Sequence, residues 1–102
     1  MITRIVRMDF QSKHIETFLQ IFSTSKQKIR DFPGCNQLEL HRDCSLKTVF
    51  YTISLWESKE ALEKYRKSEL FQTTWAQTKL LFQGPPFAYS LDKIEAVSCS
   101  EK

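Results

Sequence analysis

The sequence predicts an α+β domain in which strands and helical segments follow one another in the order β-α-β-β-α-β. Helical spacing of apolar residues marks residues 13–31 and 58–82, and the breakers Pro33-Gly34 and Gly84-Pro85-Pro86 stand where these patterns stop. Four further segments are rich in β-branched and aromatic residues, and alternate between polar and apolar side chains as strands do. They are residues 2–10, 35–42, 48–56 and 87–94.

The first half of the chain supplies a strand, a long helix and a second strand. Ser12 follows the first strand and is a plausible N-cap for a helix over residues 13–31. The apolar stripe of that helix is Ile15, Phe18, Leu19, Phe22 and Ile29. After the Pro33-Gly34 turn, residues 35–42 form a strand that places Leu38 and Leu40 on one face.

The third strand, residues 48–56, follows a hairpin loop over residues 43–47 and has large side chains on both faces. Val49, Tyr51, Ile53 and Leu55 face one way, and Phe50, Thr52, Ser54 and Trp56 face the other. Ser58 is expected to cap a short helix that runs to about Lys67, and Ser68 to cap a second one. The stripe of the second helix is Phe71, Trp75, Thr78 and Phe82.

This order of elements is the ferredoxin-like arrangement, with an antiparallel four-stranded sheet and helices on one face. The other face is apolar along the first and third strands, and a monomer would leave it uncovered. We therefore expect a homodimer in which one sheet packs against another. The domain spans residues 1–94, and residues 95–102 form a polar C-terminal tail.

Composition excludes several classes of protein. The chain has 102 residues, enough for one domain, and its 15 basic and 12 acidic residues are interleaved, so we expect no nucleic-acid partner. The three cysteines include no C-x-x-C pair, which argues against a zinc site, and Cys35 and Cys44 are expected to be small buried residues. With neither a signal peptide nor a membrane-spanning run visible, we expect a cytoplasmic protein.

Two short motifs carry a family resemblance. Phe32-Pro33-Gly34-Cys35 follows the first helix, and Trp56-Glu57-Ser58 opens the second helical segment. With the order of elements, they resemble antibiotic biosynthesis monooxygenase-like domains over about residues 2–94. The resemblance implies a dimeric α+β barrel. The family includes cofactor-independent monooxygenases of phenols and quinols, haem-degrading monooxygenases, and members without a known function.

The haem-degrading branch is the family alternative that the residues disfavour. Members of that branch carry a second Trp at the position of Tyr65 and the iron-ligating His at the position of Trp75. They also carry an Asn in the first strand, whereas residues 2–10 contain none. Without that imidazole, a haem iron would lack its proximal ligand, so no cofactor is expected.

Trp56 and Tyr65 are the candidate catalytic residues, because they stand where the third strand gives way to a helix. Phe71 and Trp75 are candidate walls of a substrate pocket, although a stripe at this spacing is more often part of a core. The remaining substrate-binding candidates are His14, in the first turn of the long helix, and Arg4, which lies on the opposite face of the first strand from Arg7. No residue spacing suggests a metal site.

The resemblance implies oxygenation of a small electron-rich aromatic substrate, of the phenol or hydroquinone type, by a cofactor-independent monooxygenase. Such an enzyme needs a dry, flat pocket with a hydrogen-bond donor or a cation for the phenolate. The alternative is a dimeric module that binds a small ligand or a partner without turnover. Convergence of Trp56 and Tyr65 on a cavity would favour the enzyme, and solid packing of both would favour the module.

Overall fold

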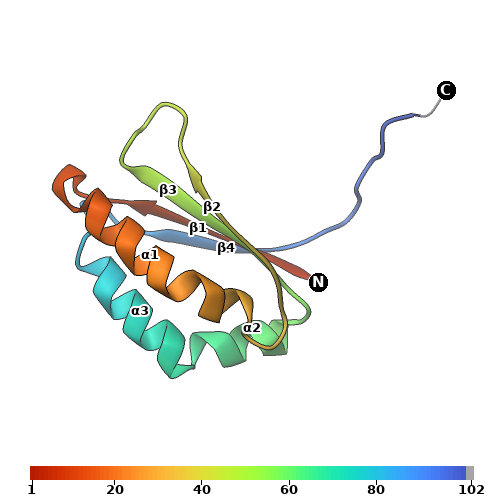
Figure 1. The fold of residues 1–102 in the computed structure, drawn as a ribbon. Helices are drawn as coiled ribbons and strands as arrows, with labels where there is room; N and C mark the ends of the chain where they lie inside the picture. Colours follow the sequence, from red (N-terminus) through yellow and green to blue (C-terminus); the bar gives the residue numbers. More distant parts are fainter. Residues whose placement is uncertain (101–102) are drawn as a thin grey trace.

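A computed structural model describes residues 1–100, and the last two residues of the expected tail lie outside the described part. The predicted order of elements is confirmed, as Figure 1 shows. The elements are β1 (Ile2–Asp9), a 3₁₀ turn η1 (Ser12–His14), α1 (Ile15–Arg30), β2 (Cys35–Arg42), β3 (Val49–Trp56), α2 (Lys59–Arg66), α3 (Glu69–Lys79) and β4 (Phe87–Asp92).

The four strands form one antiparallel sheet in the order β2-β3-β1-β4, which is the ferredoxin-like topology. The helices lie together on one face of this sheet and leave the other face bare (Figure 1). In the central pair, Arg4 lies opposite Ser54 and Met8 lies opposite Phe50. This register sends the even-numbered residues of both strands toward the helices.

Two groups of buried residues hold the helices against the sheet. The larger one centres on Phe10, whose ring stacks on Phe18 at 4.2 Å between centroids and meets Phe50 edge-on at 5.8 Å. The smaller one joins Trp56 to Cys35, Ala61 and Leu62 at the other end of the sheet. The two groups lie toward opposite ends of the helix–sheet layer.

Gly34 fixes the turn between α1 and β2. Its φ is +93°, a conformation that costs an L-residue energy, and a Cβ there would lie 2.5 Å from Cβ of Ala61. The Gly34 carbonyl accepts a hydrogen bond of 2.8 Å from the backbone N–H of Glu57. The turn thus brings the end of α1 against the junction between β3 and α2, and joins the two motifs that carried the family resemblance.

The predicted caps are confirmed at two helices and wrong at the third. The Ser58 and Ser68 side chains accept hydrogen bonds from the backbone N–H groups of Ala61 and Phe71, as N-caps do. Ser12 does not cap α1, because a tight 3₁₀ turn intervenes, in which the Gln11 carbonyl accepts a bond from the His14 N–H. His14 therefore precedes α1 and does not lie in its first turn.

Three further expectations are corrected. Cys44 is exposed in the hairpin loop, where the Asp43 carboxylate accepts hydrogen bonds from the backbone N–H groups of Ser45 and Leu46. α3 ends at Lys79, so Phe82 is not on its stripe; it pairs with Phe10 in an isolated bridge. β4 ends at Asp92, because its partner strand begins opposite, at Ile2.

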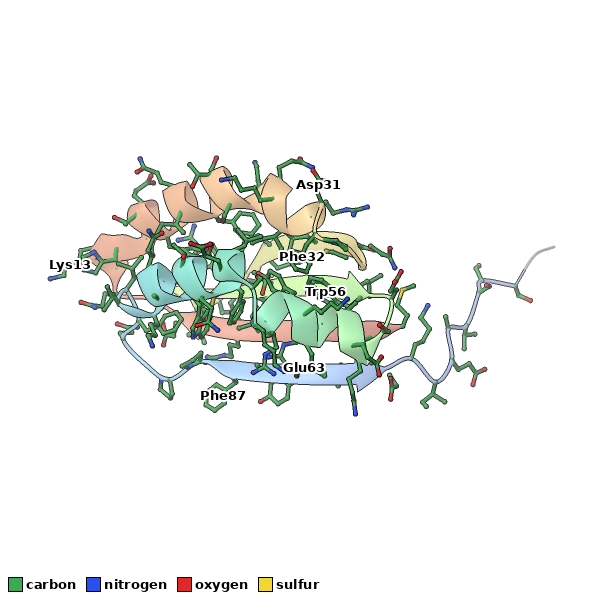
Figure 2. The ribbon with its side chains drawn as sticks, turned by 90° about the horizontal axis from the view of Figure 1, so that it is seen from below. Lys13, Asp31, Phe32, Trp56, Glu63 and Phe87 are labelled. Carbon is green, nitrogen blue, oxygen red and sulfur yellow. The ribbon has the colours of Figure 1, made fainter. Side chains whose placement is uncertain are left out.

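The face of the sheet that carries no helix is apolar toward the β4 edge. Phe87, Tyr89 and Leu91 are 45%, 53% and 47% exposed. Tyr89 lies opposite Ile5 of β1, so the three side chains share the helix-free face with Ile5. In Figure 2, Phe87 lies beside β4 at the edge of the molecule opposite α1, and Trp56 lies where β3 meets α2. Among the described residues, no helix has the length and apolar character that crossing a membrane requires.

Candidate functional site

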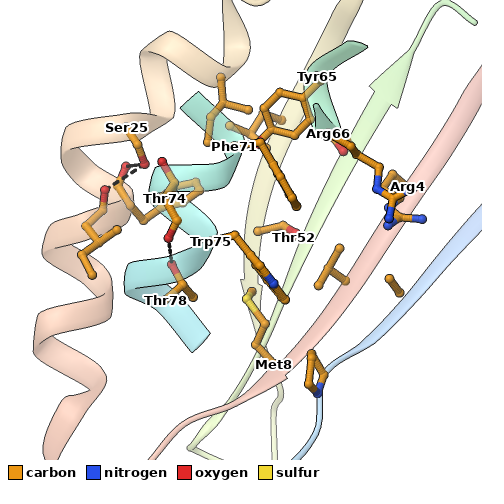
Figure 3. Close-up of a pocket in the computed structure, with 18 of the residues that line it drawn as sticks. Arg4, Met8, Ser25, Thr52, Tyr65, Arg66, Phe71, Thr74, Trp75 and Thr78 are labelled. Atoms are coloured by element: carbon orange, nitrogen blue, oxygen red, sulfur yellow. Dashed lines mark hydrogen bonds between the residues drawn. The ribbon is translucent and has the colours of Figure 1, made fainter. Parts of the chain in front are cut away.

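A cavity of about 290 Å³ lies between the helices and the sheet, in the space that the two buried groups leave between them. All four strands and α1, α2 and α3 contribute to its walls (Figure 3). Most of the lining is apolar. Its polar members are Arg4, Ser25, Thr52, Ser54, Tyr65, Arg66, Thr74 and Thr78, together with the indole nitrogens of the two tryptophans.

A continuous series of aromatic rings forms one wall. Trp56 stacks on Tyr65 with 4.8 Å between centroids, and Tyr65 meets Phe71 edge-on at 5.2 Å. Phe71 then stacks on Trp75 at 5.9 Å with only 10° between the ring planes. All four predicted aromatic residues therefore line one cavity, and Trp56 at one end of the series also belongs to the smaller buried group.

Trp56 anchors this wall and has no free donor. Its side chain is 1% exposed, and its Nε1–H donates a hydrogen bond of 2.9 Å to Oγ of Ser54, two residues earlier on the same face of β3. The indole N–H of Trp56 is therefore not available to a ligand. Its ring supports Tyr65 from behind, which makes Trp56 a positioning residue in this geometry.

Tyr65 contributes a neutral hydroxyl. Burial raises the pKa of Tyr65 well above its ordinary value, with a smaller contribution from the nearby Cys35 thiol, so the phenol stays protonated at neutral pH. Among the described residues its hydroxyl has no protein partner, and no fully buried side-chain oxygen or nitrogen lacks one. The Tyr65 hydroxyl is therefore accessible and can donate a hydrogen bond to a ligand.

Two guanidinium groups line the same cavity near the β4 edge. Arg4 extends from the helix-facing side of β1, and its Nη1 donates a hydrogen bond of 2.9 Å to Oγ of Ser90. Arg66, at the end of α2, pairs with Glu63 at 3.2 Å. Burial and the charge of Arg66 lower the pKa of Arg4, while Glu63 acts in the opposite direction. Figure 3 shows Arg4 and Arg66 on the same side of the cavity.

The lining contains no histidine, cysteine, aspartate or glutamate. His14 is half-buried at the start of α1, outside the cavity, and His41 lies on β2, where its Nε2 is 2.8 Å from Oε1 of Glu39. No group of three possible metal ligands occurs within residues 1–100. The titratable groups of the cavity are thus Arg4, Tyr65 and Arg66, none of which is a base at neutral pH.

Sequence reasoning missed Arg66 and the small polar residues of β3. Thr52 and Ser54 were placed on the same strand face as Trp56, and that shared face was the available signal for them. Arg66 gave no such signal, because α2 carries charged residues all round and only a folded chain shows which of them reaches the cavity. Arg4 was a candidate, and the structure shows that it enters the space between sheet and helices.

The sequence matches the family model of the antibiotic biosynthesis monooxygenases over residues 1–77. The chain belongs to this family. No curated protein gives a significant match. The matched segment carries β1 to α3 and nearly the whole cavity lining, so the family assignment applies to the elements that build the site.

Solved structures show the same fold. An antibiotic biosynthesis monooxygenase superposes with a TM-score of 0.87 at 19% identity, covering 93% of this chain and all of that one. A Mycobacterium tuberculosis protein gives 0.86 at 18% identity, covering 95% of this chain and 98% of that one. A Pseudomonas aeruginosa protein gives 0.81 at 24% identity, covering 92% and 94%. At these identities the likeness extends to the fold alone.

The cavity of this family member does not fit a haem. Haem iron in degrading enzymes needs an imidazole ligand, whereas Trp75 stands at that position and no histidine lines the cavity. Tyr65 is a poor substitute, because burial raises its pKa and disfavours the phenolate that would ligate iron. The cavity lining therefore offers a haem iron no imidazole ligand.

Proposed function

We propose that this family member is a cofactor-independent monooxygenase of a small, electron-rich aromatic substrate of the phenol or hydroquinone type. One observation supports this most directly: a small aromatic-walled cavity joins a neutral donor, Tyr65, to the guanidinium groups of Arg4 and Arg66. Its volume, about 290 Å³, is near the lower end of ligand sites and suits one or two fused rings.

The reaction draws all of its electrons from the substrate. The phenolate passes one electron to dioxygen, and the resulting superoxide bonds to a hydrogen-bearing ring carbon ortho or para to the phenolate oxygen, which gives a hydroperoxide after protonation. Loss of the C–H proton and cleavage of the O–O bond then leave a carbonyl. The ring loses two hydrogens and gains one oxygen atom, while the other oxygen leaves as water, so the products are a quinone and water.

The residues of the cavity serve this reaction by binding and by electrostatics. Phe71 and Trp75 hold the ring flat, and the apolar lining keeps water from the radical pair. The Tyr65 hydroxyl donates to the phenolate oxygen, and Arg4 favours the anion at longer range. Since no base lines the cavity, the substrate has to bind as its anion or lose its proton to solvent as it binds.

Oxygen uptake tests the proposal. A set of hydroquinones and naphthols of graded acidity is supplied with a metal chelator present, and products formed under ¹⁸O₂ are weighed. We expect one labelled oxygen in each quinone product. We also expect the rate to rise with pH as each phenol ionises. The pH of half-maximal rate should then follow the pKa of the substrate phenol across the set, because the cavity lining offers no base.

If the pH of half-maximal rate is the same for every substrate, a protein group acts as the base, which would contradict the proposed mechanism. Binding of these phenols without oxygen uptake would instead support the alternative, a dimeric small-ligand module. The same absence of a base from the lining is the observation that favours that alternative.

A further inference from the structure

The guanidinium groups of Arg4 and Arg66 indicate that the substrate has an acidic group in addition to its phenol. We infer that the cavity takes an aromatic acid, whose carboxylate is bound by Arg4 and Arg66 while its ring lies against the Phe71–Trp75 wall. This inference deepens the proposed function and rests on it in one respect, namely that the bound acid is a substrate.

The first observation is the charge balance of the cavity. Two cations line it and no carboxylate does. Glu63 pairs with Arg66 at 3.2 Å outside the lining, and Arg4 has only the neutral Ser90 hydroxyl as a hydrogen-bond partner among the described residues. One positive charge therefore remains without a counter-ion, and a ligand carboxylate would supply it.

The second observation is the position of Arg4. It is half-buried on the inner face of the sheet, and burial together with Arg66 lowers its pKa, which means that its charged form is poorly compensated there. An arginine stays protonated even so, and its planar fork can give a carboxylate two parallel bonds. Nη1 is already engaged with Ser90, which holds the group in place and leaves its other N–H groups free to donate.

The third observation is the place of this charge relative to solvent. Of the lining residues, Arg66, Pro86 and Ala88 are exposed, so the cavity opens between the end of α2 and the β4 edge. Arg4 lies beside this opening, because Ser90, its bonded partner, is two residues beyond Ala88 on β4. A ligand that enters with its ring toward Trp75 keeps its carboxylate at the mouth, where desolvation is least costly.

Binding of a matched acid and amide tests the inference. The probes are 2-naphthoate and 2-naphthamide, which have the same ring system and cannot be oxidised as phenols, measured by titration calorimetry with the full chain. We expect the acid to bind at least about tenfold more tightly than the amide at low salt, as one charge-assisted hydrogen bond would give. The preference should shrink as salt is added.

Variants then locate the carboxylate. Arg4→Gln should weaken naphthoate binding by about 10- to 100-fold and leave naphthamide binding nearly unchanged. Arg66→Gln should cost less than about tenfold, because Arg66 is more exposed and already paired. The matched controls are Lys64→Gln, on α2, and Lys67→Gln, at its C-cap, both exposed and outside the lining. Both remove the same charge and should keep the preference for the acid.

Two outcomes overturn the inference: equal affinity of the wild-type chain for acid and amide, or no binding of the acid at millimolar concentration. Loss of the preference in Lys64→Gln as much as in Arg4→Gln would also overturn it. These probes need no turnover, so their result is separate from the oxygenation assay. Oxygen uptake on neutral hydroquinones with no preference for naphthoate would refute this inference and leave the proposed function standing.

Discussion

Trp56 and Tyr65 form one stacked pair, yet the structure predicts opposite consequences for their conversion to phenylalanine. Trp56→Phe removes the donor of a buried hydrogen bond to Ser54 and part of a ring that is 1% exposed. The lost bond costs about 1 kcal/mol and the void about 1–2 kcal/mol. We expect the free energy of unfolding to fall by about 2–3 kcal/mol, and the melting temperature of a domain of this size by about 10–15 °C.

Tyr65→Phe removes a hydroxyl that has no protein partner among the described residues, and it leaves the stacked ring in place. Its melting temperature should change by no more than a few degrees. If the hydroxyl donates to the phenolate, the oxygenation rate should fall by about ten- to a thousandfold, the cost of losing one such donor. Trp56→Phe should weaken substrate binding more than the rate at saturation, since the wall shifts while the hydroxyl remains.

Thermal melts and oxygen uptake, measured side by side, check this pair of expectations. Ser54→Ala and the double variant with Trp56→Phe complete a cycle in which the Trp56–Ser54 bond should appear as a coupling of about 1 kcal/mol. A Trp56→Phe chain that melts like the wild type would refute the anchoring role of Trp56. Parallel losses of rate and melting temperature in Tyr65→Phe would show that Tyr65 is a core residue.

Three further predictions concern assembly, haem and the α1–β2 turn. We propose a homodimer through the bare sheet face, so sedimentation at low micromolar concentration should give twice the chain mass of 12.1 kDa. Tyr51→Glu, on that face, should yield monomers by burying an unpaired charge, whereas the control Gln77→Glu on α3 should not. A stable wild-type monomer would contradict the proposal. Haemin titration should show no stoichiometric Soret shift, and a tight one-to-one complex would be the opposing result. Gly34→Ala should destabilise the fold by about 2–4 kcal/mol through its positive φ and its approach to Ala61. Gly84→Ala, with 3.8 Å to its nearest neighbour, is the matched control, and equal melts of the two would exclude strain at Gly34.

The elements of this fold were predictable because local chemistry marks their boundaries. Ser58 and Ser68 combine a capping side chain with an apolar stripe that follows at once, and both caps formed as expected. Ser12 offered the same residue type but failed, because the bridge between Phe10 and Phe82 pins the chain before it and a tight turn follows. The difference is tertiary, and the local sequence does not contain it.

The site was predictable in its aromatic residues and only partly in its charges. Trp56 and Tyr65 stand out at a strand–helix junction, whereas the face that Arg4 uses depends on which side of β1 the helices cover. β1 is apolar on both sides, so its pattern leaves that choice open, and the register with β3 settles it. Arg66 reaches the cavity because α2 ends there, which depends on the packing of α2 against α3 rather than on its own sequence.

The distribution of charge in the cavity determines what the protein can contribute to an oxygenation. Burial keeps Tyr65 protonated, and no carboxylate or imidazole lines the walls, so none of the cavity residues is suited to withdraw a proton from a phenol. Arg4 and Arg66 act in the other direction, because two cations beside a small apolar space favour the anionic form of whatever binds there. On the proposed function, the substrate then provides both the ionised oxygen and the electrons. The chain provides a dry space, a flat aromatic wall anchored by Trp56, and a fixed positive charge that orients the anion against one neutral donor.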